Sequence, residues 1–178
     1  KEISPSFEAL NNHILSSIMS VNNTAYLTAV KAPLELRPAP LLEPKENEIM
    51  VKSHALALNP VDAAQQRLGP STFPWLKFPA VLGCDVAGQV TAVGSGVTKF
   101  KIGDRVDGYN LGAFQEYVPV KEHCCFKIPD NINYEEAAVL PLCLSVAVKT
   151  LFHPDYLALD LPSPSTIANG KVIIVWGG

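Results

Sequence analysis

The stretch that decides the fold is Asn59-Pro60-Val61-Asp62, which is followed about twenty residues later by Gly83-Cys84-Asp85-Val86-Ala87-Gly88. A residue before proline avoids the helical region, so Asn59 should end a strand that runs from Glu48 to Leu58. Asp62 can then begin a short helix that extends to Leu68. Alternating apolar and polar residues from Val86 to Val93 predict a second long strand.

Short strands separated by glycine and proline turns surround these two motifs. We expect them at Thr24–Val30, Leu34–Arg37, Arg105–Tyr109, Phe114–Val120 and Cys124–Ile128. The turn between the first two is assigned to Ala32-Pro33, and Pro38, Pro40 and Pro44 predict an exposed, extended link after them. Many short strands with such turns are typical of a β-barrel or a sandwich.

The hydrophobic period changes to that of a helix after Asn133, which is a suitable N-cap. Helical spacing continues to about Phe152, and Pro141 is expected to kink this helix. Lys171 to Trp176 is a continuous apolar run of the kind found in buried parallel strands, and Gly177-Gly178 follows it. A strand ending in glycines is how a dinucleotide-binding unit begins, although two glycines alone are a weak signal.

Composition excludes several classes of protein. The chain has 178 residues, of which 48% are hydrophobic and 17% charged, so it can bury a core and is not disordered. A net charge of −3 argues against a nucleic-acid partner, and no apolar run approaches the ~20 residues that cross a bilayer. Four cysteines without a CxxC pair favour a reducing compartment, so we expect a cytoplasmic protein. Residues 1–18 show no apolar signal-peptide core.

The order and spacing of the motifs from about residue 22 onward resemble the medium-chain dehydrogenase/reductase superfamily. Within it, the likeness is to zinc-free quinone oxidoreductases and to enoyl reductases of fungal toxin clusters. Besides the two motifs above, the likeness is carried by Val93-Gly-Ser-Gly-Val97, Gly103-Asp-Arg-Val106, Ala113-Phe-Gln-Glu-Tyr117, Ile128-Pro129, Glu135-Glu-Ala-Ala138-Val-Leu-Pro141 and Val172–Gly178. Each is unspecific alone, whereas their order is specific.

This resemblance implies a fold that is mainly β with α. A GroES-like β-barrel catalytic domain would occupy residues 19–132, after an extension of unknown role at residues 1–18. Residues 133–178 would form a linking helix and the first strand of a truncated Rossmann domain that binds NAD(P). The chain by itself would then bind cofactor poorly or not at all.

The resemblance also implies an enzyme: an NADPH-dependent reductase of activated C=C bonds in an enoyl thioester, an enone or a quinone. Hydride transfer would proceed without zinc, with NADP as the cofactor. The expected partner is a small-molecule substrate, with no nucleic acid and no membrane, and a homodimer is left open. The alternative is a GroES-like barrel that serves as a non-enzymatic binding or interaction module.

The cofactor-binding residues that the resemblance implies come from three segments. They are Asn59, Pro60, Val61 and Asp62 beneath the nicotinamide, Ser145 and Val146 on the helix turn that approaches it, and Gly177 and Gly178 at the pyrophosphate. A simpler interpretation stays open, in which Asn59 and Asp62 only end a strand and cap a helix. Relatives often carry a lysine shortly after the aspartate, where this chain has Ala63 and Ala64.

Trp75 and Phe78 are the candidate substrate-binding residues, because they lie in a proline-rich loop of fixed shape. Hydrophobic packing alone would also explain both aromatic side chains. No catalytic residue is assigned. Tyr109 and Tyr117 are candidate proton donors by residue type only.

No metal site is predicted. Cys84-Asp85 stands where zinc-dependent relatives have His-Glu, but Val61 lies at about the place of their cysteine ligand, and catalytic zinc needs three protein ligands. Cys84 is therefore expected to be a small buried residue. His123-Cys124-Cys125 is interpreted as ordinary strand, whose successive side chains point to opposite faces.

Overall fold

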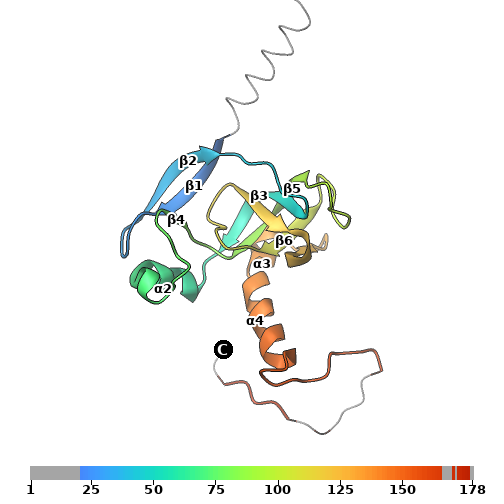
Figure 1. Cartoon of the computed structure of the whole chain (residues 1–178). Helices are drawn as coiled ribbons and strands as arrows, with labels where there is room; N and C mark the ends of the chain where they lie inside the picture. Colours follow the sequence, from blue (N-terminus) through green and yellow to red (C-terminus); the bar gives the residue numbers. More distant parts are fainter. Residues whose placement is uncertain (1–20, 166–169, 171, 177–178) are drawn as a thin grey trace, which may run out of the picture. The chain divides into compact units, whose positions relative to one another are not determined.

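Two antiparallel sheets form the body of the fold (Figure 1). A computed structural model of the chain describes residues 21–165, 170 and 172–176. The three-stranded sheet has the order β2 (Leu34–Pro40), β1 (Val21–Leu27), β4 (Ala80–Val81). The five-stranded sheet has the order β7 (Tyr117–Lys121), β3 (Glu48–Ala57), β5 (Asp85–Val93), β6 (Arg105–Tyr109), β8 (Cys125–Lys127). With its short helices, the chain confirms the predicted class, mainly β with α.

The predicted hairpin is present, but two of its details were wrong. The chain reverses at Lys31, which has a φ of 63°, and the Ala32 N–H donates to the carbonyl of Ala29, so the turn precedes Ala32-Pro33. Pro38 and Pro40 lie inside β2 and not in a link after it. β2 is an edge strand of its sheet, and a proline there can leave its missing N–H on the unpaired side.

Asn22 joins the two sheets through a buried side chain. Its Nδ2 donates to Gln115 Oε1 at 2.8 Å and to the carbonyl of Tyr117 at 2.9 Å. Its Oδ1 accepts from the Tyr117 N–H at 2.9 Å. A buried amide left without partners would cost about 1–3 kcal/mol, so this pairing fixes where β1 meets the strand pair β3–β7.

The five-stranded sheet carries the largest hydrophobic cluster. Its fully buried members come mainly from alternating positions of β3, β5, β6 and β7, namely Ile49, Val51, Val86, Val90, Val106, Val118 and Val120. For β5, this alternation is the one predicted from the sequence. Gly88 in β5 faces β3 so closely that an added Cβ would lie 2.0 Å from the Lys52 carbonyl oxygen.

The helices are short. The helix predicted after Asn59 is confirmed as α2 (Pro60–Leu68), which begins two residues before the expected Asp62 and runs into the 3-10 turn η1 (Gly69–Ser71). The helix expected after Asn133 is two helices, α3 (Tyr134–Ala138) and α4 (Pro141–Phe152), and not one kinked helix. The reason is that Pro141 disfavours a helical residue before it but suits the first turn of a new helix.

The predicted cap of α3 is confirmed, and an aromatic stack fastens this helix to the barrel. The Glu136 N–H donates to Asn133 Oδ1 at 2.7 Å, and the Asn133 N–H donates to the Glu136 carboxylate at 3.0 Å. Tyr134 stacks on His54 of β3, with ring centroids 4.5 Å apart, and the Arg105 guanidinium lies 4.8 Å from the Tyr134 ring. α3 is therefore tied to both β3 and β6.

Two other expected strands differ from the structure. His123 and Cys124 belong to a 3-10 turn, η2 (Glu122–Cys124), and β8 begins only at Cys125. Residues 172–176 are exposed and form no strand. A parallel strand is stable only beside a neighbour, and no described strand pairs with this run. Residues 1–18, Lys171, Gly177 and Gly178 lie outside the described residues.

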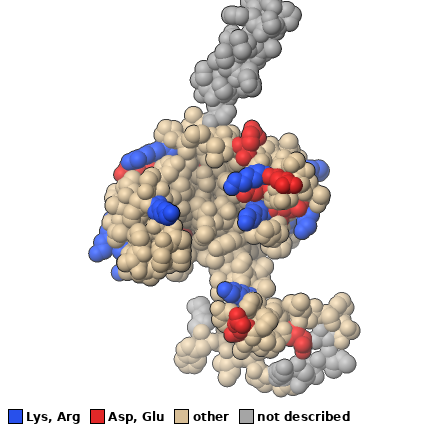
Figure 2. Space-filling model, viewed as in Figure 1, with Lys and Arg blue, Asp and Glu red and all other residues tan. Residues whose placement is uncertain are grey.

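The chain divides into two compact units, one up to Cys143 and one from Leu144 onward. Within the described residues, no helix has the length and apolar character needed to cross a membrane. Figure 2 shows Lys and Arg side chains in several separate places on one face, some of them beside Asp and Glu. Among the described residues, that face offers no continuous basic surface.

Gly88→Ala tests how closely β3 and β5 must approach. The new methyl group would overlap the Lys52 carbonyl and force the strands apart, so we expect the free energy of unfolding to fall by about 1–3 kcal/mol or more. Gln89→Ala, at the exposed neighbouring position, should change it by no more than about 0.5 kcal/mol. Urea unfolding measures both values, and equal losses would contradict the close approach.

Candidate functional site

A buried carboxylate, Asp85, connects three elements. It opens β5 and is 0% exposed. Its Oδ2 accepts a hydrogen bond from Asn59 Nδ2 at 2.7 Å, and its Oδ1 accepts from the Leu142 N–H at 2.7 Å. Short bonds to a carboxylate are among the strongest that proteins form. Asp85 therefore holds together the residue that precedes α2, the start of β5 and the first turn of α4.

Asp62 forms a second buried connection within the Asn59–Asp62 turn. Its Oδ2 accepts from the Asn59 backbone N–H at 2.8 Å, and its Oδ1 accepts from the Gly83 N–H at 3.2 Å. Asp62 thus caps α2, as the simpler interpretation expected. Asn59 stands at the N-cap position, but its side-chain amide donates to Asp85 and not to the helix.

Burial is the main cause of the shifted pKa values in this network. Desolvation raises the pKa of Asp85 above its usual value, while the hydrogen bonds from Asn59 and Leu142 oppose the shift. Desolvation also raises the pKa of Asp62, and the nearby charge of Asp85 adds to it. Burial, followed by the charges of these two carboxylates, raises the pKa of the Cys84 thiol to about 12. At neutral pH Cys84 is a neutral thiol and a poor nucleophile.

The donor set at this place does not fit a zinc ion. Cys84 is buried, as predicted, and Val61 has no ligand atom, so this place lacks the three protein ligands that a catalytic zinc needs. Across residues 21–165, 170 and 172–176, no three His, Cys, Asp or Glu side chains form a group that could hold a metal. His123 and Cys124 lie in η2, and Cys125 is buried with a raised pKa.

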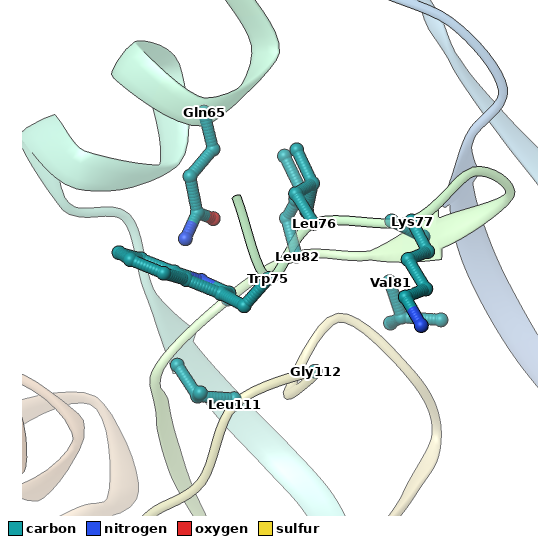
Figure 3. Close-up of a pocket in the computed structure, with 10 residues that line it drawn as sticks. Gln65, Trp75, Leu76, Lys77, Val81, Leu82, Leu111 and Gly112 are labelled. Carbon is teal, nitrogen blue, oxygen red and sulfur yellow. The ribbon is translucent and has the colours of Figure 1, made fainter. Parts of the chain in front are cut away.

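A pocket of about 270 Å³ opens beside the network (Figure 3). Its walls come from α2, the loop after η1, β4 with the two residues that follow it, and the turn between β6 and β7. Gly83 belongs to the pocket wall and also donates to Asp62. The hydrogen-bonded turn and the pocket therefore share a piece of backbone.

The two aromatic residues predicted to bind substrate lie in different places. Trp75 lines the pocket and is 62% exposed, with Phe73 packed edge-to-face at 5.4 Å between centroids. Phe78 packs in a hydrophobic cluster with Leu27 and Leu82, and it is not a lining residue. The structure thus places Trp75, but not Phe78, at the pocket.

The other predicted residues lie on separate elements. Ser145 and Val146 are exposed positions of α4 in the second unit. Tyr109 lies in β6, where burial is the main cause of a raised pKa, and Tyr117 lies at the start of β7. Neither tyrosine lines the pocket, so neither is brought to Trp75.

Sequence reasoning missed two residues of this site. Asp85 was considered only for metal binding, although a charged residue in front of the apolar run Val86-Ala87 signals a buried carboxylate that needs partners. Gln65 was not considered at all. It follows Asp62 by three residues, which puts both on one face of α2, and these two are the buried residues of that helix.

A second hollow, of about 450 Å³, lies between β2 and the end of β3. Leucines at positions 34, 36, 56 and 58 supply much of its surface, and Leu58 directly precedes Asn59. Its lining is more apolar than that of the first pocket, and it does not include Gly83, whose N–H donates to Asp62. The first pocket is therefore the better candidate for a site of chemistry.

Comparison with known proteins gives a consistent assignment. The sequence profile of the "Alcohol dehydrogenase GroES-like domain" matches residues 45–130. Dehydrogenase pigH of Monascus ruber is 44% identical over an alignment of 173 residues, which covers 90% of this chain and 47% of the relative. Trans-enoyl reductase himH of Aspergillus japonicus is 40% identical over 157 residues, 82% of this chain and 44% of the relative.

Solved structures agree with the sequence relatives. Escherichia coli quinone oxidoreductase in complex with NADPH superimposes with a TM-score of 0.63 at 28% identity, over 76% of this chain and 41% of that one. The chain spans about half the length of the relatives that it matches, 47% in the case of Dehydrogenase pigH. The profile match over residues 45–130 includes Asn59, Asp62 and Asp85.

Exchanging the two partners tests the Asn59–Asp85 hydrogen bond. Asp85→Asn turns an N–H₂ group toward a donor, and Asn59→Asp sets two buried carboxylates against each other, so each should cost about 1–3 kcal/mol. The double variant restores a donor and an acceptor and keeps an oxygen for the Leu142 N–H. We expect it to be more stable than the sum of the single effects by about 1–3 kcal/mol in urea unfolding. Additive losses would show that the pair does not interact.

The raised pKa of Asp85 predicts a pH dependence. The usual pKa of an aspartate is 3.8. Above pH 3.8, Asp85 is therefore protonated to a larger extent in the folded chain than in the unfolded chain. The free energy of unfolding therefore falls as the pH rises through the raised pKa. This contribution is absent from Asp85→Asn. The stability of the native protein minus that of the variant should shrink from about pH 4 upward, and a difference that grows with pH would mean a lowered pKa.

Proposed function

Because the chain belongs to the medium-chain dehydrogenase/reductase superfamily, with a GroES-like domain, we propose that the whole protein is an NADPH-dependent reductase of activated C=C bonds. Its substrate would be an enoyl thioester, an enone or a quinone. The observation that carries the proposal is the similarity to Trans-enoyl reductase himH at 40% identity over 157 residues. The pocket beside the Asn59–Asp62 turn supplies a place for a small molecule.

The turn fits one face of a nicotinamide ring. Pro60 is exposed and Val61 half-buried, so they offer apolar surface to a flat ring, while the polar groups of Asn59 and Asp62 are taken up by internal hydrogen bonds. Ser145 and Val146 would approach the same ring, and Gly177 and Gly178 would let backbone approach the pyrophosphate. The preference for NADPH rests on the relatives, one of which is solved with that nucleotide.

When bound, NADPH would supply the hydride for the carbon β to the carbonyl group, and a proton would follow at the α-carbon. The residues of this chain would do the positioning. The pocket walls between α2 and β4 would hold the substrate against the turn, and the Asp62 and Asp85 hydrogen bonds would keep the turn rigid. Correct placement of two reactants can lower a barrier by ~7–11 kcal/mol, so the site does not need a reactive side chain of its own.

The same residues support a reaction without zinc. The thiol of Cys84 has its pKa raised to about 12, and Val61 has no ligand atom. Polarisation of the substrate carbonyl would then have to come from hydrogen bonds, which stabilise a developing enolate in enzymes that lack a metal.

A non-enzymatic binding module is the second candidate. It is favoured by one observation, namely that the polar groups of Asn59 and Asp62 are used to hold the fold and not to face the pocket. Such a module would keep the pocket and bind a ligand without turnover. The two candidates differ in their response to a reduced nucleotide.

The full-length protein, mixed with NADPH, should enhance and blue-shift the fluorescence of the nucleotide. Addition of an enone or a quinone should then deplete NADPH, followed at 340 nm, whereas the saturated analogue should not. NADH serves as the comparison nucleotide. A full-length protein that leaves NADPH fluorescence unchanged would contradict the reductase and favour the binding module.

A further inference from the structure

The side-chain amide of Gln65 stands out among the groups that line the pocket. Gln65 belongs to α2 and is only 5% exposed, yet it is a wall residue of the pocket. Long amide side chains are rarely buried to this extent without a partner, because a buried amide without a hydrogen bond lowers the free energy of unfolding. The hydrogen-bond partner of the Gln65 amide therefore bears on what the pocket binds.

In the described part of the chain, no group forms a hydrogen bond with the Gln65 amide. The same residues contain no fully buried side-chain nitrogen or oxygen that lacks a partner. The two facts together mean that the Gln65 amide keeps contact with the space of the pocket. Its neighbour Gln66 behaves differently, because Gln66 Nε2 donates to the carbonyl of Ala32 at 2.8 Å.

The amide is aimed at a flat aromatic surface. In Figure 3, Gln65 points from α2 toward the indole of Trp75, and Lys77 lies away from that indole. Trp75 presents its ring to the pocket, and the buried side chains of Leu76 and Leu82 line the same hollow. The arrangement is a space of mixed polar and apolar lining, with the Trp75 ring as one wall and one uncommitted amide.

We propose that Gln65 is a specificity-determining residue whose Nε2 donates a hydrogen bond to the carbonyl oxygen of a planar substrate lying against Trp75. The enoyl thioesters, enones and quinones of the proposed function, on which this assignment rests, share one feature, a carbonyl oxygen conjugated with the C=C bond. A carbonyl oxygen only accepts, and the amide offers it a donor on a side chain that is only 5% exposed. Molecules of the same shape that lack this oxygen would leave the Gln65 amide without a hydrogen-bond acceptor.

Two ligands that differ only in the carbonyl group test the assignment. 1-Indanone and indane have the same fused rings, and neither has an activated C=C bond, so binding can be measured without turnover. We expect the full-length protein to bind 1-indanone more tightly than indane in ligand-observed NMR titrations. Gln65→Leu should weaken 1-indanone binding by roughly 3- to 10-fold, the range for one neutral hydrogen bond, and leave indane binding unchanged.

Gln66→Leu is the matched control, because it removes the same amide from the next residue of α2. Its loss should lower stability through the missing bond to Ala32 and leave the preference for 1-indanone intact. The assignment is overturned if Gln65→Leu keeps the preference, or if Gln66→Leu abolishes it equally. It is also overturned if the unmodified protein binds both ligands alike, a result that does not depend on any variant folding.

The titrations contain no nucleotide and no reducible substrate, so their outcome is separate from that of the NADPH experiment. A preference that depends on Gln65 in a protein that never oxidises NADPH would refute the reductase and support a carbonyl-binding site. A protein that oxidises NADPH with an enone but shows no dependence on Gln65 would refute this assignment alone.

Discussion

The buried carboxylate of Asp85 is the constraint on which the candidate site depends. A carboxylate without access to water is costly unless hydrogen bonds replace its hydration, and here the Asn59 amide and the Leu142 N–H supply them. These donors come from the turn before α2 and from the first turn of α4. The hydrogen bonds that Asp85 requires therefore fix the positions of that turn, the start of β5 and the start of α4 together. Gly83, held by Asp62, then becomes a fixed part of the pocket wall.

The polar groups near the pocket divide into two kinds. Asn59, Asp62 and Asp85 satisfy one another and the backbone, and Cys84 is kept neutral by burial and by the two carboxylates beside it. Gln65 alone among the buried polar residues of this region keeps its amide for the pocket, as far as the described residues show. Such a site would orient a ligand and not attack it, which agrees with the proposed reductase, in which the cofactor would carry the chemistry.

Much of the barrel could be predicted from the sequence because strand alternation and caps are local signals. The alternation along β5, the start of α2 after Asn59-Pro60 and the cap at Asn133 all depend on residues a few positions apart. Where the local signal was ambiguous, the prediction failed. Prolines inside β2 are tolerated only because that strand is at an edge, and the apolar run of residues 172–176 has no described neighbour with which to pair.

By itself, then, the sequence determined the class of fold, the places where strands give way to helices, and the absence of a ligand atom at Val61. Only the tertiary structure decided what the polar residues do. Asn59 meets Asp85 across 26 positions and Leu142 meets it across 57, and no short-range pattern encodes such partners. The same holds for Gln65 and Gln66, which are adjacent and identical in type. One faces a pocket and the other a backbone carbonyl, because the packing of α2 gives them different neighbours.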